Sequence, residues 1–377
     1  MIRTNKKIIA ILSIALVIAA CKKDEDLIIE PMCTPDTGHV SQFYNTEGST
    51  TTPEYFVVAD ASDRVISPQD LDFHPNSSRP NELWVLNKGT QNTGSSTVTI
   101  NNAGLVGQTT DRRIDGNAWH FMSLSTALAF SPDNNNFATS PGVYDANHNG
   151  GAPFTGPALW SSDMSIYAKP SGGNGSHLDM LHESPYSMGI AHEKDNIFWV
   201  FDGNSNQIVK YDFKADHGPG NSYHDDGEVD RYIGISITRK AGVPSHMVID
   251  KSTNWMYICD TGGKRILRMR INSGTKKRDL SFLYETLAMR REMENPEWEV
   301  FAETDLVDPC GVDIIGNRLF VSDNATNKII AYRIDTKEEL ARIQTTATSI
   351  KGIKIGPTGK LWYVDNSSNQ VVRIDPK

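Results

Sequence analysis

Four residues of types that bind zinc or copper stand before short apolar segments far apart in the chain: His120, His182, His246 and Cys310. Imidazole nitrogen and thiolate sulfur are ligands of these borderline or soft metal ions. The four residues form no contiguous ligand motif, so a metal site needs a fold that gathers their segments around one point. Without such a fold they are loop residues with ordinary hydrogen bonds. Both interpretations stay open at this stage.

One loop matches the opening of a calcium-binding motif. Asp145, Asn147, Asn149 and Gly150 fit the pattern D-x-[DN]-x-[DN]-G, in which alternate oxygen ligands surround a hard cation and Gly permits the turn. The position of the closing bidentate Glu is occupied by Gly156. The segment is therefore either a structural calcium site or an insertion rich in Asn and Gly.

A second loop concentrates carboxylates at Asp225, Asp226, Glu228 and Asp230. Such close negative charges repel one another unless water solvates them or a cation bridges them. The first three are candidate calcium ligands, and a solvated loop is the alternative.

Another set of carboxylates recurs at one place in a repeat: Asp202, Asp260, Asp323 and Asp365. An Asp at the end of a strand accepts hydrogen bonds from backbone N–H groups two residues on and fixes a turn. We predict turn capping here, with an acidic rim that recognises a cation as the alternative. Trp84, Trp199, Trp255 and Trp362 also recur at equivalent strand positions and are predicted to pack in the core.

The elements that position these residues are repeated hairpins. Five segments contain an apolar strand, a turn of Asp, Asn, Gly or Ser, and a second strand with alternating apolar residues; they begin at Leu83, Ile197, Trp255, Leu319 and Leu361. Another short strand precedes each of them. A sixth copy begins at Ala127, and an insertion displaces its later strands.

The repeat predicts an all-β fold, a six-bladed β-propeller with four-stranded blades. The six inner strands begin near residues 70, 127, 188, 246, 311 and 351, and this spacing suits four-stranded blades with variable loops. The last blade ends after three strands, so residues 55–59 are predicted to supply its fourth strand and close the ring. Residues 280–293 are the one ambiguous segment and are compatible with an outer strand.

The repeats, with inner strands such as PSHMVIDKSTNWMYICDTGGKRILRM, resemble NHL-repeat propellers over residues 67–377. The resemblance implies a binding site on one face of a central channel. Pro244-Ser245-His246 also resembles the Pro-His element with which the peptidylglycine amidating lyases, propellers of this type, place a zinc-binding histidine. The corresponding positions of other blades are Ser125, Ser187 and Gly311, so that ligand set is not matched residue by residue.

The N-terminus has the pattern of a lipoprotein signal peptide. Arg3, Lys6 and Lys7 precede an apolar run at residues 8–20, which is too short for a comfortable membrane span. The run ends Ile-Ala-Ala-Cys, which resembles a lipobox, and Cys21 is the predicted lipidation site. The following Lys-Lys-Asp-Glu-Asp resembles the export signal of surface lipoproteins of the Bacteroidetes. We expect a signal peptide at residues 1–20, a tether at 21–38 and the propeller at 39–377.

The charge balance bears on the partners. Removal of Arg3, Lys6 and Lys7 leaves 34 of the 37 Lys and Arg residues against 46 Asp and Glu, a net charge of −12. An acidic chain argues against nucleic acid, and membrane attachment is expected through lipid instead of charge. The expected location is the bacterial cell envelope, in the outer membrane, with the protein either exposed on the cell surface or facing the periplasm.

The sequence leads to two functional hypotheses. In the first, the protein is a scaffold that binds a ligand, a peptide or another protein on one face of the channel. In the second, it is a metal-dependent lyase or hydrolase that uses the histidines at the channel mouth. The chain has no G-x-S-x-G, H-E-x-x-H or C-x-x-C motif and no phosphate-binding glycine loop, which favours the first hypothesis.

Overall fold

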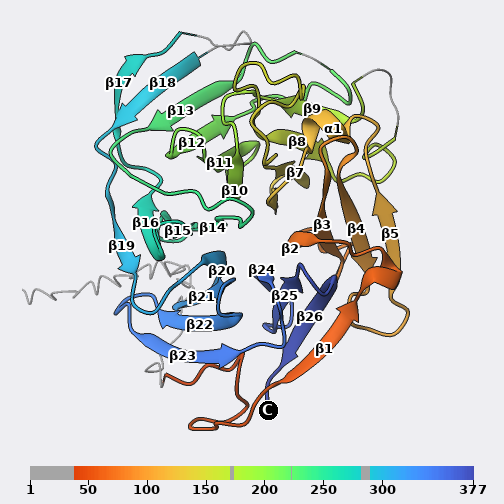
Figure 1. The fold of residues 1–377 in the computed structure, drawn as a ribbon, viewed down its shortest axis with the longest axis vertical. Coiled ribbons are helices and arrows are strands. Elements are labelled where there is room, and N and C mark those ends of the chain that lie inside the picture. The colour runs from red at the N-terminus through yellow and green to blue at the C-terminus, as the bar shows by residue number, and fades with distance from the viewer. Residues whose placement is uncertain (1–37, 170–173, 222, 282–288) are drawn as a thin grey trace, which may run out of the picture. The chain divides into compact units, whose positions relative to one another are not determined.

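Six β-sheets surround a central axis in the computed structural model, which describes residues 38–169, 174–221, 223–281 and 289–377 (Figure 1). Within these ranges the only helices are the single turns η1 (Ala61–Asp63) and α1 (Ala118–Phe121). Residues 38–377 form one compact unit. The prediction of an all-β six-bladed propeller is confirmed. The predicted signal peptide and the predicted lipidation site, Cys21, lie outside the described residues.

The blades follow one another along the chain, and each begins with its innermost strand. Blade 1 contains β2 (Pro68–Phe73), β3 (Leu83–Thr90), β4 (Gly94–Asn101) and β5 (Thr109–Arg113). Blade 2 contains β6 (Leu128–Phe130), β7 (Asn136–Thr139), β8 (Ala158–Ser161) and β9 (His177–Met180). Blade 3 begins with β10 (Ser187–Lys194), β11 (Ile197–Asp202), β12 (Gln207–Asp212) and β13 (Glu228–Tyr232).

The second half of the ring has the same order. Blade 4 contains β14 (Met247–Asp250), β15 (Trp255–Asp260), β16 (Arg265–Arg270) and β19 (Trp298–Ala302). Blade 5 contains β20 (Pro309–Ile315), β21 (Arg318–Asp323), β22 (Lys328–Arg333) and β23 (Glu339–Gln344). Blade 6 contains β24 (Ile350–Ile355), β25 (Leu361–Asp365) and β26 (Gln370–Asp375). The six inner strands therefore begin where the repeat predicts them.

The fourth strand of blade 6 comes from the N-terminal side of the ring. Strand β1 (Glu54–Ala59) pairs antiparallel with β26, from Glu54 opposite Asp375 to Ala59 opposite Val371. Its Val58 is buried in a cluster with Trp362 and Val364. The predicted closure by residues 55–59 is confirmed, and it leaves no unpaired edge on β26.

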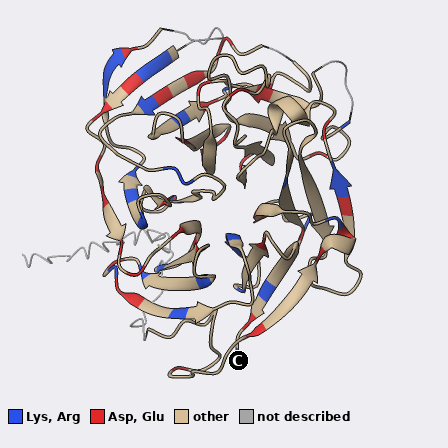
Figure 2. Ribbon diagram, viewed as in Figure 1, with Lys and Arg blue, Asp and Glu red and all other residues tan. Residues whose placement is uncertain are grey.

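Blade 3 carries two further strands that come from blade 4. The chain leaves β16, forms β17 (Thr275–Asp279) and β18 (Met289–Glu294), and returns to β19. Strand β18 pairs in parallel with β13 and antiparallel with β17. Figure 2 shows that basic and acidic residues line these outer strands. The ambiguous segment of the sequence thus includes an outer strand, but in the neighbouring blade.

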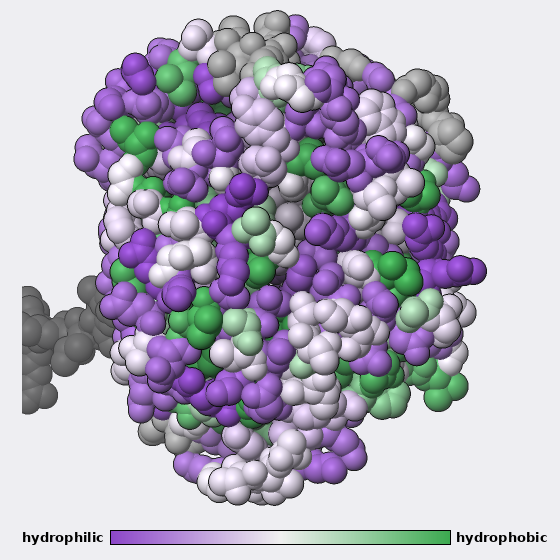
Figure 3. Space-filling model, viewed as in Figure 1, coloured by the Kyte–Doolittle hydropathy of each residue, from purple (hydrophilic) through white to green (hydrophobic). Residues whose placement is uncertain are grey.

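Apolar residues between adjacent blades form the core. Trp84, Trp199 and Trp362 are buried, as predicted, whereas Trp255 is half-buried beneath the guanidinium groups of Arg268 and Arg270. On the face drawn in Figure 3, apolar residues are mostly scattered among hydrophilic ones. Within the described part of the chain, no helix has the length and apolar character needed to span a membrane.

The recurring aspartates cap turns, as predicted. In blade 5, Asp323 accepts hydrogen bonds from the backbone N–H groups of Val307 at 2.7 Å and Thr326 at 3.0 Å. In blade 6, Asp365 accepts from Thr348 and Ser349, each at 3.0 Å. Each carboxylate therefore ties the turn after a second strand to the loop that enters the same blade.

Candidate functional site

The central channel is lined by the inner strands of all six blades. A hollow of about 250 Å³ lies among Asp70, Phe73, Phe130, Ile190, Met247, Val312 and Lys354, with their neighbours. Nζ of Lys354 lies 3.2 Å from Asp72 and 3.7 Å from Asp313, so two carboxylates balance this ammonium group. Burial alone would lower the pKa of Lys354, but Asp313 and Asp72 raise it.

The His246 side chain, just before strand β14 of blade 4, reaches across the central channel. Its Nε2 is 3.0 Å from the carbonyl oxygen of Thr126 in blade 2, and its Nδ1 is 3.5 Å from Oδ1 of Asp70 in blade 1. The oxygens of Asp70 also accept from the backbone N–H groups of Leu71 and Leu128. These contacts connect three blades through the channel, which gives the imidazole a bridging role in the fold.

Three basic side chains gather where the inner strands begin. Lys88 and Arg239 line a hollow of about 190 Å³ together with Gln69 and Gly242. Lys351 donates from Nζ to Oε1 of Gln69 at 2.9 Å and to the carbonyl oxygen of Gly242 at 3.1 Å. We call these five residues the channel mouth.

Lys351 is a buried cation at this mouth, with an exposed fraction of 4%. Among the described residues, no carboxylate oxygen lies within 4.0 Å of the side-chain nitrogens of Lys88, Arg239 or Lys351. Burial, together with the positive charge of Lys88, lowers the pKa of Lys351 to about 8. The mouth therefore has positive charge that its own residues do not balance, unlike Lys354 deeper in the channel.

Cys310 is buried on β20, beneath the mouth. Its Sγ lies 3.3 Å from Oγ of Ser322 and 3.5 Å from the carbonyl oxygen of Ile350. Burial raises the pKa of the thiol to about 12. The thiol is therefore protonated near neutral pH, and its S–H can donate to the carbonyl oxygen of Ile350.

A histidine-rich cavity of about 320 Å³ lies at the outer strand of blade 2. Its walls are formed by Asn117, Trp119, His120, Phe121, Asn147, Asn174, His177, His182 and His224. The Nε2 atoms of His120 and His182 are 3.1 Å apart. The ring of His177 stacks on Phe121 with centroids 3.6 Å apart, and burial lowers its pKa to about 3, so this imidazole is neutral.

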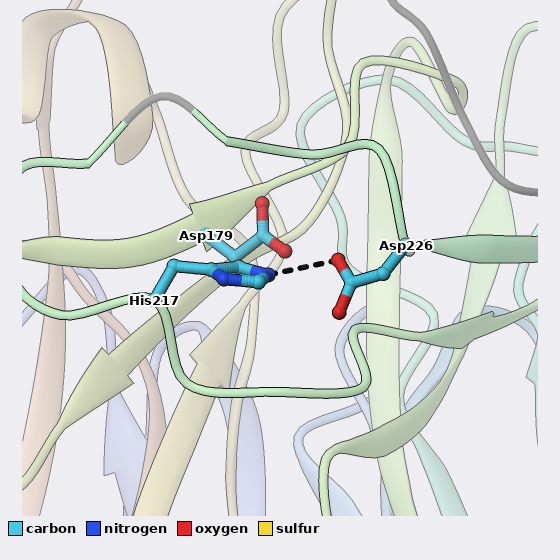
Figure 4. Close-up of side chains that lie close together, drawn as sticks. All are labelled: Asp179, His217 and Asp226. Atoms are coloured by element: carbon cyan, nitrogen blue, oxygen red, sulfur yellow. Dashed lines mark hydrogen bonds and ion pairs between the residues drawn. The ribbon is translucent and has the colours of Figure 1, made fainter.

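Further titratable groups lie beside this cavity. Asp179 on β9 is fully buried and contacts Nδ1 of His224 through Oδ1. In the loop between β12 and β13, Nε2 of His217 lies 2.8 Å from Oδ1 of Asp226 (Figure 4). We call Asp179, His217, His224 and Asp226 the rim cluster.

The four metal ligands predicted from sequence do not meet at one point. His120 and His182 lie together in the histidine-rich cavity, whereas His246 contacts Thr126 and Cys310 contacts Ser322. Among the described residues, the one trio of His, Cys, Asp or Glu ligand atoms within 4.8 Å of one another is Asp179, His217 and Asp226. The metal-dependent lyase or hydrolase stays a prediction.

The predicted calcium loops have internal partners. Asp145 accepts from the backbone N–H groups of Asn147 at 2.8 Å and Gly151 at 3.1 Å, and Oδ1 of Asn149 accepts from Gly151 at 3.0 Å. In the second loop, Glu228 pairs with Lys214 at 2.8 Å and with Arg291 at 3.0 Å. Asp226 pairs with His217, and Asp225 is exposed. Calcium at these positions stays a prediction.

Sequence reasoning missed Lys351 at the channel mouth, and it did not single out Asp179, His217 or His224 of the rim cluster as ligands. Lys351 and Lys354 interrupt an inner strand whose other residues are Ile and Gly, which is a usable signal. His177, Asp179 and His182 occur in the segment HLDMLH, where alternation along a strand places His177 and Asp179 on one face. No local signal connects this segment with His217, His224 and Asp226, because the pairing of β12 with β13 determines where their loop lies.

Comparison with known proteins shows the fold. No protein family and no curated protein matches the chain in sequence. Similar solved structures include an auxiliary nutrient binding protein from Bacteroides ovatus, with 14% identity, a TM-score of 0.51, and coverage of 82% of this chain and 69% of that one. An auxiliary nutrient binding protein from Bacteroides thetaiotaomicron has 11% identity, a TM-score of 0.55, and coverage of 81% and 68%.

Proposed function

We propose that this protein is a ligand-binding protein of the bacterial cell envelope and that it binds a small anionic ligand at the channel mouth. The observation that carries the proposal is Lys351, a buried cation without a carboxylate partner among the described residues. Transfer of an ammonium group out of water is costly unless an opposite charge compensates it. An anionic ligand supplies that compensation.

The other groups of the channel mouth fit the same ligand. The Arg239 guanidinium, stacked 3.9 Å from the centre of the Tyr186 ring, can offer two parallel donors to a carboxylate. Lys88 adds a second ammonium group, and Gln69 and Gly242 add polar atoms that orient a ligand. A hollow of about 190 Å³ suits a metabolite of about the size of a monosaccharide acid.

Two further observations support a binding role. Both Bacteroides proteins of this fold are described as auxiliary nutrient binding proteins. The N-terminal pattern that ends at Cys21 supports lipid attachment and therefore a location in the cell envelope. Two or three acyl chains would hold the protein at the membrane essentially irreversibly. In this proposal the signal peptide covers residues 1–20, the tether 21–38 and the NHL-like propeller 39–377. The lipid anchor attaches the protein to the outer membrane.

Calorimetric titration with matched ligand pairs tests the proposal. The probes are glucuronate against glucose and succinate against succinamide, so that each pair differs in charge more than in shape. We expect the anions to bind and the neutral partners not to bind. Because binding requires protonated Lys351, with a pKa of about 8 in the free protein, affinity should fall as pH rises through that value, by at most about tenfold per pH unit.

Substitutions locate the site. Lys351→Met should weaken anion binding at least tenfold, since a buried charge–charge contact is lost. Lys360→Met is the matched control, because Lys360 belongs to the same blade and pairs with Asp375 at 2.8 Å. Equal affinity for charged and neutral partners, or unchanged affinity in Lys351→Met, would contradict the proposed site.

A further inference from the structure

The rim cluster joins two blades through two imidazoles and two carboxylates. Asp179 belongs to β9 of blade 2, and His217, His224 and Asp226 belong to the loop before β13 of blade 3. One ligand atom from each of Asp179, His217 and Asp226 lies within 4.8 Å of the other two, and Figure 4 shows the three side chains converging. This arrangement comes from the fold and not from a contiguous motif.

The second observation is the state of Asp179. Its residue surface is fully buried, and among the described residues its Oδ2 has no hydrogen-bond partner. Buried carboxylate oxygens are nearly always hydrogen-bonded or bound to a metal, because an isolated one loses its hydration without compensation. Within the described chain, the ion pairs of Asp179 include His224 but no Lys or Arg. A positively charged partner would therefore stabilise the buried Oδ2 of Asp179.

Imidazole protonation is the alternative source of positive charge. It would let His224 or His217 donate to Asp179 or Asp226, but it leaves Oδ2 of Asp179 without a donor. A divalent ion accepts electron pairs from the His217 imidazole and from both carboxylates at once. Imidazole nitrogen and carboxylate oxygen are both zinc ligands, and an imidazole ligand argues against the hard ions calcium and magnesium.

We propose that Asp179, His217 and Asp226 bind one divalent transition-metal ion of the zinc type, with His224 beside the site through its contact with Asp179. The required rearrangement is small. In a tetrahedral site with bonds of about 2.0–2.2 Å, ligand atoms are separated by about 3.4 Å on purely geometric grounds. The atoms of Asp179, His217 and Asp226 already lie within 4.8 Å of one another, and the 2.8 Å contact between His217 and Asp226 needs to open by about 0.6 Å.

Such an ion would connect blades 2 and 3 at their outer strands. It would also fix the wall of the histidine-rich cavity, because His224 lines that cavity and contacts Asp179. The site is independent of the channel mouth, which takes its residues from other blades. Its presence or absence therefore leaves the anion-binding proposal untouched.

Zinc titration of the tag-free protein after EDTA treatment and dialysis tests this site. The expected result is one zinc ion per chain, competition by cobalt(II) but not by calcium, and the visible absorption bands of tetrahedral cobalt in the substituted protein. Zinc should also raise the melting temperature, because it binds the folded state and not the unfolded chain.

Three variants make the assignment specific. His217→Gln and Asp179→Asn should each weaken zinc binding at least tenfold and abolish the cobalt bands. Asp225→Asn is the matched control, since Asp225 is an exposed neighbour in the same loop and should leave binding unchanged. His217→Gln alters a loop residue, so it remains informative if Asp179→Asn does not fold. Zinc binding that is absent, or that persists with wild-type affinity in His217→Gln, overturns the proposal.

Discussion

Two blades of this propeller receive a strand from another part of the chain, and they hold that strand by different forces. Strand β1 completes blade 6 in antiparallel pairing with β26, and its Val58 and Ala59 are buried. Strand β18 extends blade 3 in parallel pairing with β13, and none of its residues is fully buried. Its Arg291 lies 3.0 Å from Glu228 and also contacts Asp230.

The difference separates closure of the ring from local positioning. The free energy of apolar burial scales with the buried area and does not depend on a partner's charge. Strand β1, which closes the whole ring, is held by this kind of contact. Charged pairs contribute less and need defined geometry, but they fix orientation. Backbone N–H of Met289 meets the carbonyl oxygen of Gly227, the last residue before β13, so β18 secures the end of the loop that contains His217, His224 and Asp226.

The largest effect is expected from a charge placed in the closing strand. Val58→Asp buries a carboxylate beside Trp362 and Val371 and should lower the free energy of unfolding by about 3–5 kcal/mol. Phe56→Asp is the control on the same strand: Phe56 is 47% exposed, and a carboxylate there would lie near Arg373, whose guanidinium is 4.8 Å from the Phe56 ring. Urea denaturation followed by tryptophan fluorescence measures both variants.

Equal stability of the two variants would mean that β1 does not close the ring in solution. The claim that apolar burial holds β1 in place would then be wrong.

The repeat made this closing strand predictable. Three strands in the last blade and an unassigned segment YFVVA before the first left one simple way to complete the ring. Strand β18 was not predictable in the same way. Its MRREME sequence has no alternating apolar face, and its partners Asp230 and Glu228 are distant in the chain. Its parallel pairing with another blade follows from tertiary contacts alone.

The same division applies to the candidate sites. His246 was located correctly at the start of β14, because the repeat fixes the beginning of each inner strand. Its contact with Thr126 across the channel depends on how the six blades meet, which the repeat does not specify. Loops between strands position His120, His182 and the rim-cluster residues His217, His224 and Asp226, and a repeat carries no information about such loops.

Breaking the buried ion pair of β18 should have the next largest effect. Nε of Arg290 lies 2.7 Å from Oε2 of Glu183, with exposed side-chain fractions of 9% and 0%. Arg290→Met removes this partner from a buried carboxylate and should lower the free energy of unfolding by about 3 kcal/mol. In Arg278→Met, the lost pair with Glu292 involves an arginine side chain that is 62% exposed, and the denaturation midpoint should not move measurably.

The order of these two arginine variants is the decisive observation. If Arg278→Met destabilises the protein as much as Arg290→Met, the hairpin is held by its exposed charges and not by its buried one.

The smallest expected effect is that of salt, which should change the amide hydrogen exchange of β18 but not that of β1. The Debye length falls from about 10 Å at 0.1 M to about 3 Å at 1 M salt, so sodium chloride weakens the partly exposed pairs of Arg291 with Glu228 and Asp230. It does not weaken apolar burial of Val58 and Ala59. Amide hydrogen exchange should therefore become severalfold faster in β18 between these salt concentrations and stay unchanged in β1. Mass spectrometry of peptides that cover residues 289–294 and 54–59 measures both strands in one sample, so each serves as the control for the other.

Faster exchange in both would indicate that charges also hold the closing strand. Unchanged exchange in both would show that backbone pairing with β13, and not Arg291, keeps β18 in place.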